Sequence, residues 1–401
     1  MAHVVVVGAG PAGLMAAEIA ARADHTVTIF ERMPSPARKF LMAGLGGLNI
    51  THAGALDEFL ASYFHLPDHL KAAIRAFPPD ALRAWAEELE EPVFVGSSGK
   101  MFPKCFKTSP LLRKWLRRLD QNKVELLTRH KWVGFEGGST LKFQTPNKGI
   151  ISQSYDAAVF SMGGASWPRL GGDGAWLSLL ESYADVVPFE PSNMGINVDW
   201  SDHLRSKHAG APLKSIAISC QGQTVASELL LTNYGLEGSA IYAMSAHLRE
   251  CLRDKPVELS IDLRPGQSEE KLAGRLERVP AKQSLSNCLR RALKFSPAET
   301  ALVYEVGSPP SDSQLLAKHI KHLPLKAKGI QGLDRAISSA GGIKEQSLTE
   351  HFMIRNQPGL FVAGEMLDFD APTGGYLLQA CLSSGWQAGQ GVVQFLAQPN
   401  D

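Results

Sequence analysis

Three glycines near the amino terminus have the spacing of a loop that binds the phosphates of a dinucleotide. Gly8, Gly10 and Gly13 form a G-x-G-x-x-G pattern directly after four valines at positions 4–7. In such a loop the first glycine permits a tight turn, the second lets a pyrophosphate approach the backbone, and the third lets the helix pack closely on the strand. Unpaired N–H groups at the helix start then face the phosphates. The pattern predicts dinucleotide binding.

An acidic residue stands where such a loop needs an acceptor for ribose hydroxyls. Residues 26–30 are predicted to form the second strand, and Glu31 follows them, 18 residues after Gly13. A carboxylate there accepts hydrogen bonds from an adenosine ribose and repels a 2′-phosphate. A tight strand–helix turn without a ligand is the alternative. Because strand, helix, second strand and acid are all in register, we favour the dinucleotide.

A second glycine-rich segment, near the carboxyl terminus, favours FAD over NAD. Residues 359–363 are predicted to form a buried strand that ends in Gly364 and Glu365, and Gly-Gly-Tyr at 374–376 opens an amphipathic helix. In FAD proteins of the glutathione-reductase type, such an acid lies near the ribityl phosphate, and the helix start stabilises the anionic reduced flavin. A solvated acid is the alternative for Glu365. A second dinucleotide motif and a C-x-x-C pair, which a pyridine-nucleotide disulfide reductase would need, are both absent from the sequence.

Hydride transfer through a flavin needs a polar clamp and often a proton donor or acceptor. Tyr376 could supply a hydrogen bond or an aromatic wall, and Asn49 lies on a loop dense in glycine. We take these two as the candidate catalytic residues. Lys39 could contact the flavin or its phosphates, with a solvated loop charge as the alternative, and His52 is more simply a surface or cap histidine. The sequence shows no Ser-His-Asp or paired-carboxylate arrangement.

The predicted cofactor site combines these motifs with neighbouring small and basic residues. Its members are Gly8, Gly10, Pro11, Ala12, Gly13, Glu31, Arg32, Lys39, Gly46, Gly47, Leu48, Asn49, Val133, Gly163, Gly164, Gly364, Glu365, Gly374, Gly375 and Tyr376.

The elements that position these residues predict an α/β protein of two domains. A buried strand near 155–161 returns the chain to a doubly wound parallel sheet of the Rossmann type with an antiparallel meander. From about residue 189 the pattern changes, and segments such as 215–220 and 257–262 alternate as antiparallel strands do. We expect a discontinuous FAD-binding domain at 1–188 and 334–401. An inserted substrate or cap domain of strands and helices is expected at 189–333.

Composition limits the partners and the compartment. The 401 residues include 41 Lys and Arg against 40 Asp and Glu, so neither nucleic acid nor an anionic membrane is an expected partner. The five cysteines are far apart, which argues against a redox-active disulfide and against a zinc site, so no metal is predicted. The first strand starts at residue 3 or 4, and no apolar run reaches membrane-spanning length. We expect a cytoplasmic protein, and the sequence does not predict its oligomeric state.

Taken together, these blocks resemble the YhiN/BaiN-type flavoproteins over nearly the whole chain. The glycine loop at 8–13 is shared by many flavoproteins, whereas the carboxy-terminal blocks, Ala-Gly-Glu-Met-Leu-Asp at 363–368 and Thr-Gly-Gly-Tyr at 373–376, are more specific. The resemblance implies an FAD domain interrupted by an insert built around a small β-barrel and helices. It also implies chemistry at carbon–carbon double bonds, without naming a substrate.

The chain departs from that family where chemistry is concerned. Relatives have Gly-Arg-Cys-Asn where this chain has Gly-Gly-Leu-Asn at 46–49, so chemistry that relies on that thiol or guanidinium is not expected here.

Three functions follow from the sequence. The leading one is an FAD-dependent oxidoreductase that passes hydride to or from a small molecule, with NADH or NADPH as a transient donor. The second is a flavoenzyme that acts on a macromolecule such as tRNA, and the third is a flavin-binding protein without turnover.

Overall fold

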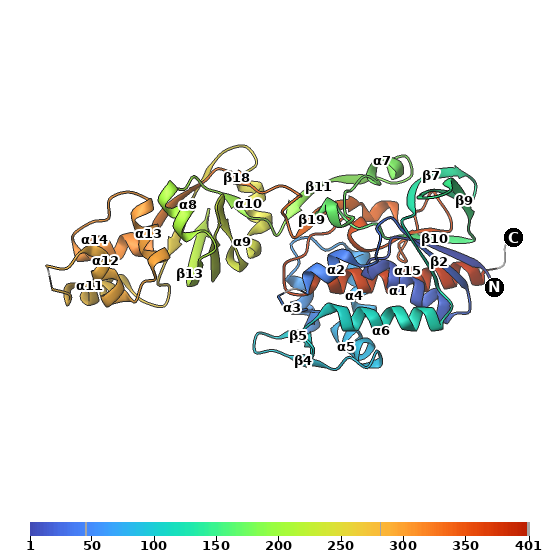
Figure 1. Cartoon of the computed structure of the whole chain (residues 1–401), viewed down its shortest axis with the longest axis horizontal. Coiled ribbons are helices and arrows are strands. Elements are labelled where there is room, and N and C mark those ends of the chain that lie inside the picture. The colour runs from blue at the N-terminus through green and yellow to red at the C-terminus, as the bar shows by residue number, and fades with distance from the viewer. Residues whose placement is uncertain (45, 281, 399–401) are drawn as a thin grey trace. The chain divides into compact units, whose positions relative to one another are not determined.

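The chain folds into two compact units, which are described separately (Figure 1). The computed structural model describes residues 1–44, 46–280 and 282–398. The first unit comprises Met1–Pro191 with Ile337–Asp401, and the second comprises Ser192–Ala336.

A five-stranded parallel sheet forms the centre of the first unit, in the order β20-β10-β1-β2-β6. From β1 the chain continues to β2 and β6 on one side and later adds β10 and β20 on the other. The strand order therefore reverses between β1 and β10, and ligands of such sheets bind beyond the carboxyl ends of the strands at this point. The strands are β1 His3–Val7, β2 Thr26–Glu31, β6 Glu125–Thr128, β10 Ala157–Phe160 and β20 Leu360–Val362.

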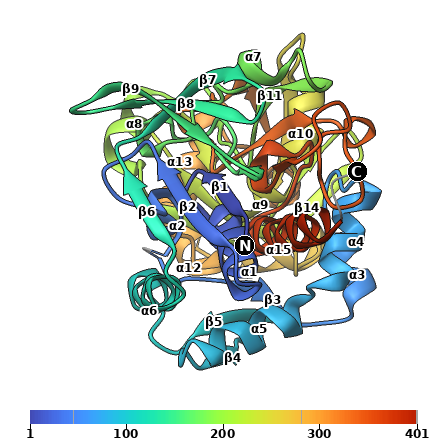
Figure 2. The ribbon, with the colours of Figure 1, turned by 90° about the vertical axis from the view of Figure 1, so that its right-hand side faces the viewer.

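The four valines of β1 show why this strand is central. Val4 and Val6 pack with residues of the helices α1, α6 and α15, whereas Val5 and Val7 pack with residues of the meander β7–β9. Helices thus cover one face of the sheet and the meander the other (Figure 2). These elements are α1 Pro11–Arg22, α6 Thr108–Gln121, α15 Tyr376–Ala397, β7 Lys131–Gly137, β8 Thr140–Thr145 and β9 Gly149–Ser154.

Residues 56–88 form three separate helices. Pro67 and Pro78 stand immediately before the second and third of them. Proline cannot continue a helix, because it lacks an N–H group, but it suits the position at or before a helix start. The remaining elements of this unit are α2 Arg38–Ala43, α3 Leu56–Ala61, α4 Asp68–Ala76, α5 Pro79–Glu88, α7 Leu177–Leu180, β3 Thr51–His52, β4 Val93–Val95, β5 Lys100–Pro103, β11 Val186–Ser192 and β19 Ser338–Ile343.

The second unit is built on a seven-stranded antiparallel sheet in the order β17-β16-β13-β14-β15-β12-β18. Only Lys328 separates β17 from β18, the strands at the two edges, so the sheet curls until its edges approach each other. This curvature agrees with the small barrel that the family resemblance implies. The strands are β12 Ile196–Asn197, β13 Pro212–Cys220, β14 Gln223–Leu231, β15 Gly235–Glu237, β16 Val257–Asp262, β17 Leu323–Ala327 and β18 Gly329–Ile330.

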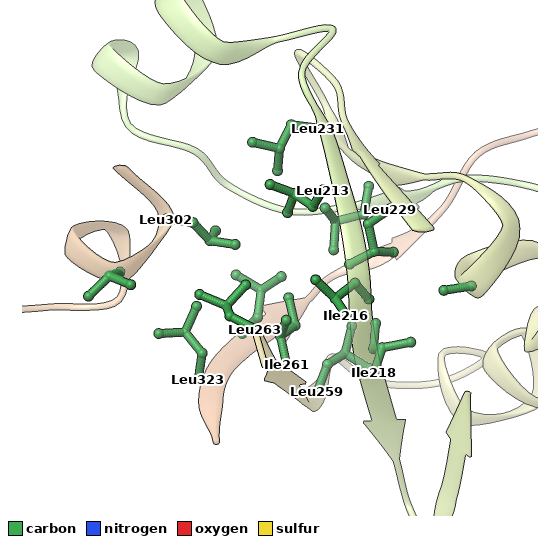
Figure 3. Close-up of a cluster of buried hydrophobic side chains, with 14 of the residues drawn as sticks. Leu213, Ile216, Ile218, Leu229, Leu231, Leu259, Ile261, Leu263, Leu302 and Leu323 are labelled. Atoms are coloured by element: carbon green, nitrogen blue, oxygen red, sulfur yellow. The ribbon is translucent and has the colours of Figure 1, made fainter. Parts of the chain in front are cut away.

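Alternate side chains of these strands form the core of the second unit. Figure 3 shows Ile216 and Ile218 of β13 gathered with Ile261 of β16, and all three are buried. Helices close the core: α8 Asp202–His208, α9 Ser239–Ala243, α10 Ser245–Cys251, α11 Glu269–Glu277, α12 Leu285–Leu293, α13 Pro297–Glu305 and α14 Ser313–Lys321. Among the described residues, no helix has both the length and the apolar character needed to cross a bilayer.

Candidate functional site

A cavity of about 350 Å³ opens beyond the carboxyl ends of β1, β2 and β10, where the strand order reverses. Its walls also include the loop after β2, the start of β7, residues 170–179 and the turn after β20. The predicted cofactor residues that line it are Gly8, Gly10, Pro11, Ala12, Glu31, Arg32, Lys39, Val133, Gly163, Gly364 and Glu365.

The three glycines of the first loop have different surroundings. Gly8 has a φ of +104°, and a Cβ there would collide with the backbone of Ser161. A Cβ on Gly13 would collide with the Gly8 carbonyl oxygen and with Ser161 Oγ, so Gly13 serves helix–strand packing. Gly10 has an ordinary φ of −81°, and nothing lies within 4 Å of the position of a Cβ on it. Open space therefore lies beside Gly10 at the start of α1.

Glu31 lies at the end of β2 with both carboxylate oxygens held by backbone donors. Ala9 N–H donates to Oε2 over 2.9 Å, and Met33 N–H donates to Oε1 over 2.7 Å. Burial raises the pKa of Glu31 above its usual value, and these two hydrogen bonds only partly offset that effect. Each oxygen keeps a second lone pair, so the carboxylate is oriented by the fold and still able to accept a ligand hydroxyl.

The loop after Glu31 brings guanidinium groups to the cavity. Arg32 forms an ion pair with Asp173 at 2.5 Å. Burial alone would raise the pKa of Asp173, but hydrogen bonds from Arg32 and from Ala175 N–H outweigh burial and lower it. Arg38 also lines the cavity. Arg32 was predicted from the sequence as a site residue, whereas Arg38 and Asp173 were not.

An ion pair joins the two ends of the chain at the cavity. Lys39 Nζ donates to Glu365 Oε2 and to Ser166 Oγ, both over 2.8 Å. Glu365 is only 8% exposed. Next to it, a Cβ on Gly364 would lie 2.9 Å from Ala12 Cβ, so the turn after β20 packs directly on α1. The amino-terminal and carboxy-terminal glycine motifs therefore contribute to one site.

The start of α15 lies beside Asn49 and does not belong to the lining of that cavity. Gly375, with a φ of +93°, caps the helix, and a Cβ on it would lie 3.1 Å from Asn49 Oδ1. The ring of Tyr376 stacks on Phe59 with 4.5 Å between centroids, and the phenol donates to Ser62 Oγ over 3.4 Å. These contacts fix the Tyr376 ring as part of an aromatic wall.

Other predicted residues have packing roles or stand apart from the cavity. Leu48 is 1% exposed in the hydrophobic core, so its side chain offers nothing to a ligand. Gly164 packs against Ser339 and Glu365. Gly46 and Gly47 lie on the loop before Leu48 and are absent from the cavity lining, as is Gly374.

Several polar atoms at the site are buried without a partner in the described part of the chain. Those in the cavity lining are Arg32 Nε, Arg38 Nε, Trp132 Nε1 and Glu365 Oε1, and both polar atoms of the Asn49 side chain, outside that lining and beside Gly375, are in the same condition. Buried polar groups are normally hydrogen-bonded, and unpartnered ones mark the place of a ligand or of ordered water. Donors of this kind suit phosphates and ring carbonyls, and acceptors such as Glu365 suit hydroxyls. The residues present therefore fit a flavin dinucleotide.

Comparison with protein families and curated proteins gives matches along nearly the whole chain. The family model described as HI0933-like protein Rossmann domain matches residues 2–391. The chain is 23% identical to a 3-dehydro-bile acid delta(4,6)-reductase of Clostridium scindens, over 98% of this chain and 100% of that protein. It is 25% identical to a ribosomal RNA dihydrouridine synthase of Escherichia coli, over 97% of each chain.

Solved structures share the fold at low sequence identity. One is an open flavocytochrome c3 fumarate reductase, with a TM-score of 0.53 and 12% identity over 99% of this chain and 79% of that one. Another is a 3-ketosteroid-delta4-(5alpha)-dehydrogenase of Rhodococcus jostii, with a TM-score of 0.51 and 15% identity over 98% of this chain and 96% of that one.

Proposed function

Since the chain belongs to the HI0933-like family, which includes the YhiN/BaiN-type FAD-dependent oxidoreductases, we propose that it uses non-covalently bound FAD to reduce a carbon–carbon double bond conjugated to a carbonyl group. The observation that carries the FAD assignment is the contact between Lys39 and Glu365 at the cavity. Next to this contact, Gly364 packs on Ala12, so the carboxy-terminal glycine turn lies against the amino-terminal glycine loop, as one elongated dinucleotide requires.

The relatives support reduction of a conjugated double bond. One is named a delta(4,6)-reductase of 3-dehydro-bile acids, and two are named ribosomal RNA dihydrouridine synthases. Each name describes saturation of a carbon–carbon double bond, and in a uracil ring that bond is conjugated to a carbonyl. Conjugation makes the distal carbon electron-poor, so it accepts a hydride while the neighbouring carbon takes a proton.

The chain's own residues have distinct parts in this proposal. Glu31 accepts from the ribose hydroxyls, and the backbone at Gly10 and the start of α1 bind the pyrophosphate. Lys39 and Glu365 hold the middle of the cofactor, Asn49 bonds the edge of the ring, and Tyr376 forms a wall. When bound, FAD supplies the hydride chemistry.

The resemblance implies that relatives have a cysteine where this chain has Leu48, so no thiol is available as a proton donor at that position. Leu48 has no proton to give, and its side chain is buried in the core. We therefore propose that Asn49 positions the substrate or flavin as a hydrogen-bonding clamp, and that water supplies the proton.

NADH or NADPH is the proposed electron donor. The sequence has only one dinucleotide motif, at Gly8, Gly10 and Gly13. A nicotinamide would therefore bind transiently against the flavin and leave before the acceptor enters.

RNA is the second candidate substrate, because two relatives are named for acting on ribosomal RNA. The near-neutral charge of the whole chain favours a small molecule. However, the charge is unevenly divided: residues 192–336 contain 19 Lys and Arg against 15 Asp and Glu, so the second unit is basic and the remainder acidic. A basic unit favours contact with a phosphate backbone.

One experiment tests cofactor, donor and acceptor in sequence. The purified protein should be yellow, and anaerobic mixing with NADH or NADPH in a stopped-flow instrument should bleach the flavin absorbance. The reduced protein is then mixed with small enones and, separately, with ribosomal RNA lacking dihydrouridine, and reoxidation is followed. Rapid reoxidation by one class identifies the substrate class. A colourless protein that takes up no added FAD contradicts the cofactor, and a reduced flavin that neither acceptor class reoxidises contradicts the reaction.

A further inference from the structure

Three side chains with metal-binding atoms meet within the second unit. Cys220 is the last residue of β13, and His247 and Cys251 lie four residues apart on α10. One ligand atom from each lies within 4.8 Å of the other two. This is the only such group of histidine, cysteine or acidic side chains among the residues that the structure describes.

Two distances measured from Cys251 match those between neighbouring ligands of a metal ion. Cys251 Sγ lies 3.5 Å from His247 Nε2 and 3.2 Å from Gln221 Oε1. Zinc lies about 2.3 Å from sulfur and about 2.0 Å from histidine nitrogen in tetrahedral sites, which puts neighbouring ligand atoms roughly 3.3–3.8 Å apart. The spacing of His247 and Cys251 is therefore already that of a loaded site, and the ligand atom of Cys220 lies within 4.8 Å of both.

Two of the three side chains are accessible to an ion from solvent, and the histidine ring is held in place by a hydrogen bond. Cys220 is 2% exposed, whereas His247 and Cys251 are partly exposed. His247 Nε2 lies 3.0 Å from the Cys220 carbonyl oxygen, which holds the ring against the end of β13. One hydrogen bond must be exchanged for a metal bond if this nitrogen is the ligand.

We propose that Cys220, His247 and Cys251 bind one Zn²⁺ ion, with the fourth position taken by Gln221 Oε1 or by water. Two thiolates and an imidazole are a ligand set that zinc favours. The ion ties the turn between β13 and β14 to α10 and so stiffens one end of the sheet. The site lies entirely in the second unit, and it does not depend on the proposed flavin chemistry.

The ion is tested with Co²⁺, whose absorption reports its ligands. Full-length protein, reduced and freed of metal by a chelator, is titrated with Co²⁺. We expect one equivalent to produce thiolate-to-cobalt absorption in the near ultraviolet and intense visible bands of tetrahedral cobalt, both abolished when Zn²⁺ is added. Zn²⁺ should also raise the melting temperature.

Two variants and a matched control locate the site. Cys251→Ser and His247→Ala change the partly exposed ligands and should each weaken Co²⁺ binding by about tenfold or more, with melting curves without metal close to that of the parent. Cys288→Ser changes a partly buried cysteine on α12 in the same unit and should leave Co²⁺ binding unchanged.

Three results would overturn the proposal. The first is a reduced protein that gives no thiolate–cobalt absorption. The second is equal Co²⁺ binding by the parent and the two ligand variants. The third is a thiol assay on the unreduced protein that counts three of the five thiols, because Cys220 and Cys251 are joined as a disulfide, with no metal bound after reduction.

Discussion

Lys39 Nζ and Glu365 Oε2 lie 2.8 Å apart, although 326 residues separate them in the sequence. Lys39 follows β2 through a basic loop, and Glu365 follows β20 through a glycine turn. Both side chains line the cavity, where Glu365 is 8% exposed. One ion pair therefore connects the stability of the first unit with the shape of its ligand site.

We expect Lys39→Met to destabilise the protein by about 1–3 kcal/mol, because it leaves a buried carboxylate without its cation. This expected loss of stability is smaller than for a fully buried ion pair, because Lys39 is 25% exposed. Urea unfolding measures the loss, and FAD affinity should fall with it. Lys148→Met, at an exposed turn, is the control and should change neither quantity.

The double variant Lys39→Met/Glu365→Gln separates the lost attraction from the stranded charge. It should recover most of the stability that Lys39→Met loses, because the uncompensated carboxylate is gone. A double variant as unstable as the sum of its single variants would show that the two side chains are not coupled.

Alanine at the second and at the third glycine of the amino-terminal loop should affect different properties, FAD affinity at Gly10 and stability at Gly13. Gly13→Ala places a methyl group against the Gly8 carbonyl, so the unfolding free energy should fall by about 1–3 kcal/mol with or without FAD. Gly10→Ala meets no protein atom within 4 Å, so the apoprotein should keep its stability while FAD affinity falls about tenfold or more. Apoprotein melting and flavin titration measure the two effects. Loss of stability in Gly10→Ala, or full FAD affinity in it, would contradict the assignment of this space to the pyrophosphate.

Local patterns were sufficient to predict the layers of the first unit. Four consecutive valines at 4–7 indicate a strand that is buried on both faces of its sheet. In the structure, helices cover one face and the meander covers the other. The spacing of Gly8 and Gly13 also predicted the close approach of helix and strand at these two glycines, because both lie within one stretch of six residues. Such features depend on neighbours along the chain.

Features that depend on the path of a loop were not predictable. Arg38, Trp132 and Asp173 reach the cavity from three segments, and no short pattern marks them. The same holds for Cys220 and Cys251: no metal site was expected because the cysteines are far apart in the sequence, whereas the fold brings the end of a strand next to a helix. The only local signal was a histidine and a cysteine four residues apart, which places both on one face of a helix.

Glu31 should make FAD binding pH-dependent. Its pKa in the folded protein is raised by burial, so protonation begins at a higher pH than for an ordinary glutamate. A protonated carboxyl loses acceptor capacity for the ribose hydroxyls, so the FAD dissociation constant should increase as the pH falls through this pKa. Flavin fluorescence titrations from neutral pH downward measure it, and Glu31→Gln should show a weaker affinity with a flatter pH profile.

The same group acts in the opposite direction on the apoprotein. Because the folded pKa of Glu31 lies above its unfolded value, its contribution to stability is fully present below the unfolded pKa and is lost as the pH rises through the folded pKa. Comparing apoprotein unfolding of the parent and Glu31→Gln over that range isolates this contribution. An identical pH dependence of FAD affinity in the two proteins would show that Glu31 does not contact the ribose.

Asn49 and Leu48 are neighbours in sequence with separable roles. Both polar atoms of the Asn49 side chain are buried without a partner among the described residues, so Asn49→Ala should leave apoprotein stability within about 0.5 kcal/mol of the parent. It should weaken FAD binding by about 1 kcal/mol, or roughly fivefold, because a hydrogen bond to the ring is lost. Leu48→Ala removes a side chain that is 1% exposed and should cost about 2–5 kcal/mol of stability. Unfolding curves of the apoproteins and flavin titrations of the same samples measure both roles, and an Asn49→Ala protein with lowered stability and unchanged FAD affinity would make Asn49 a packing residue.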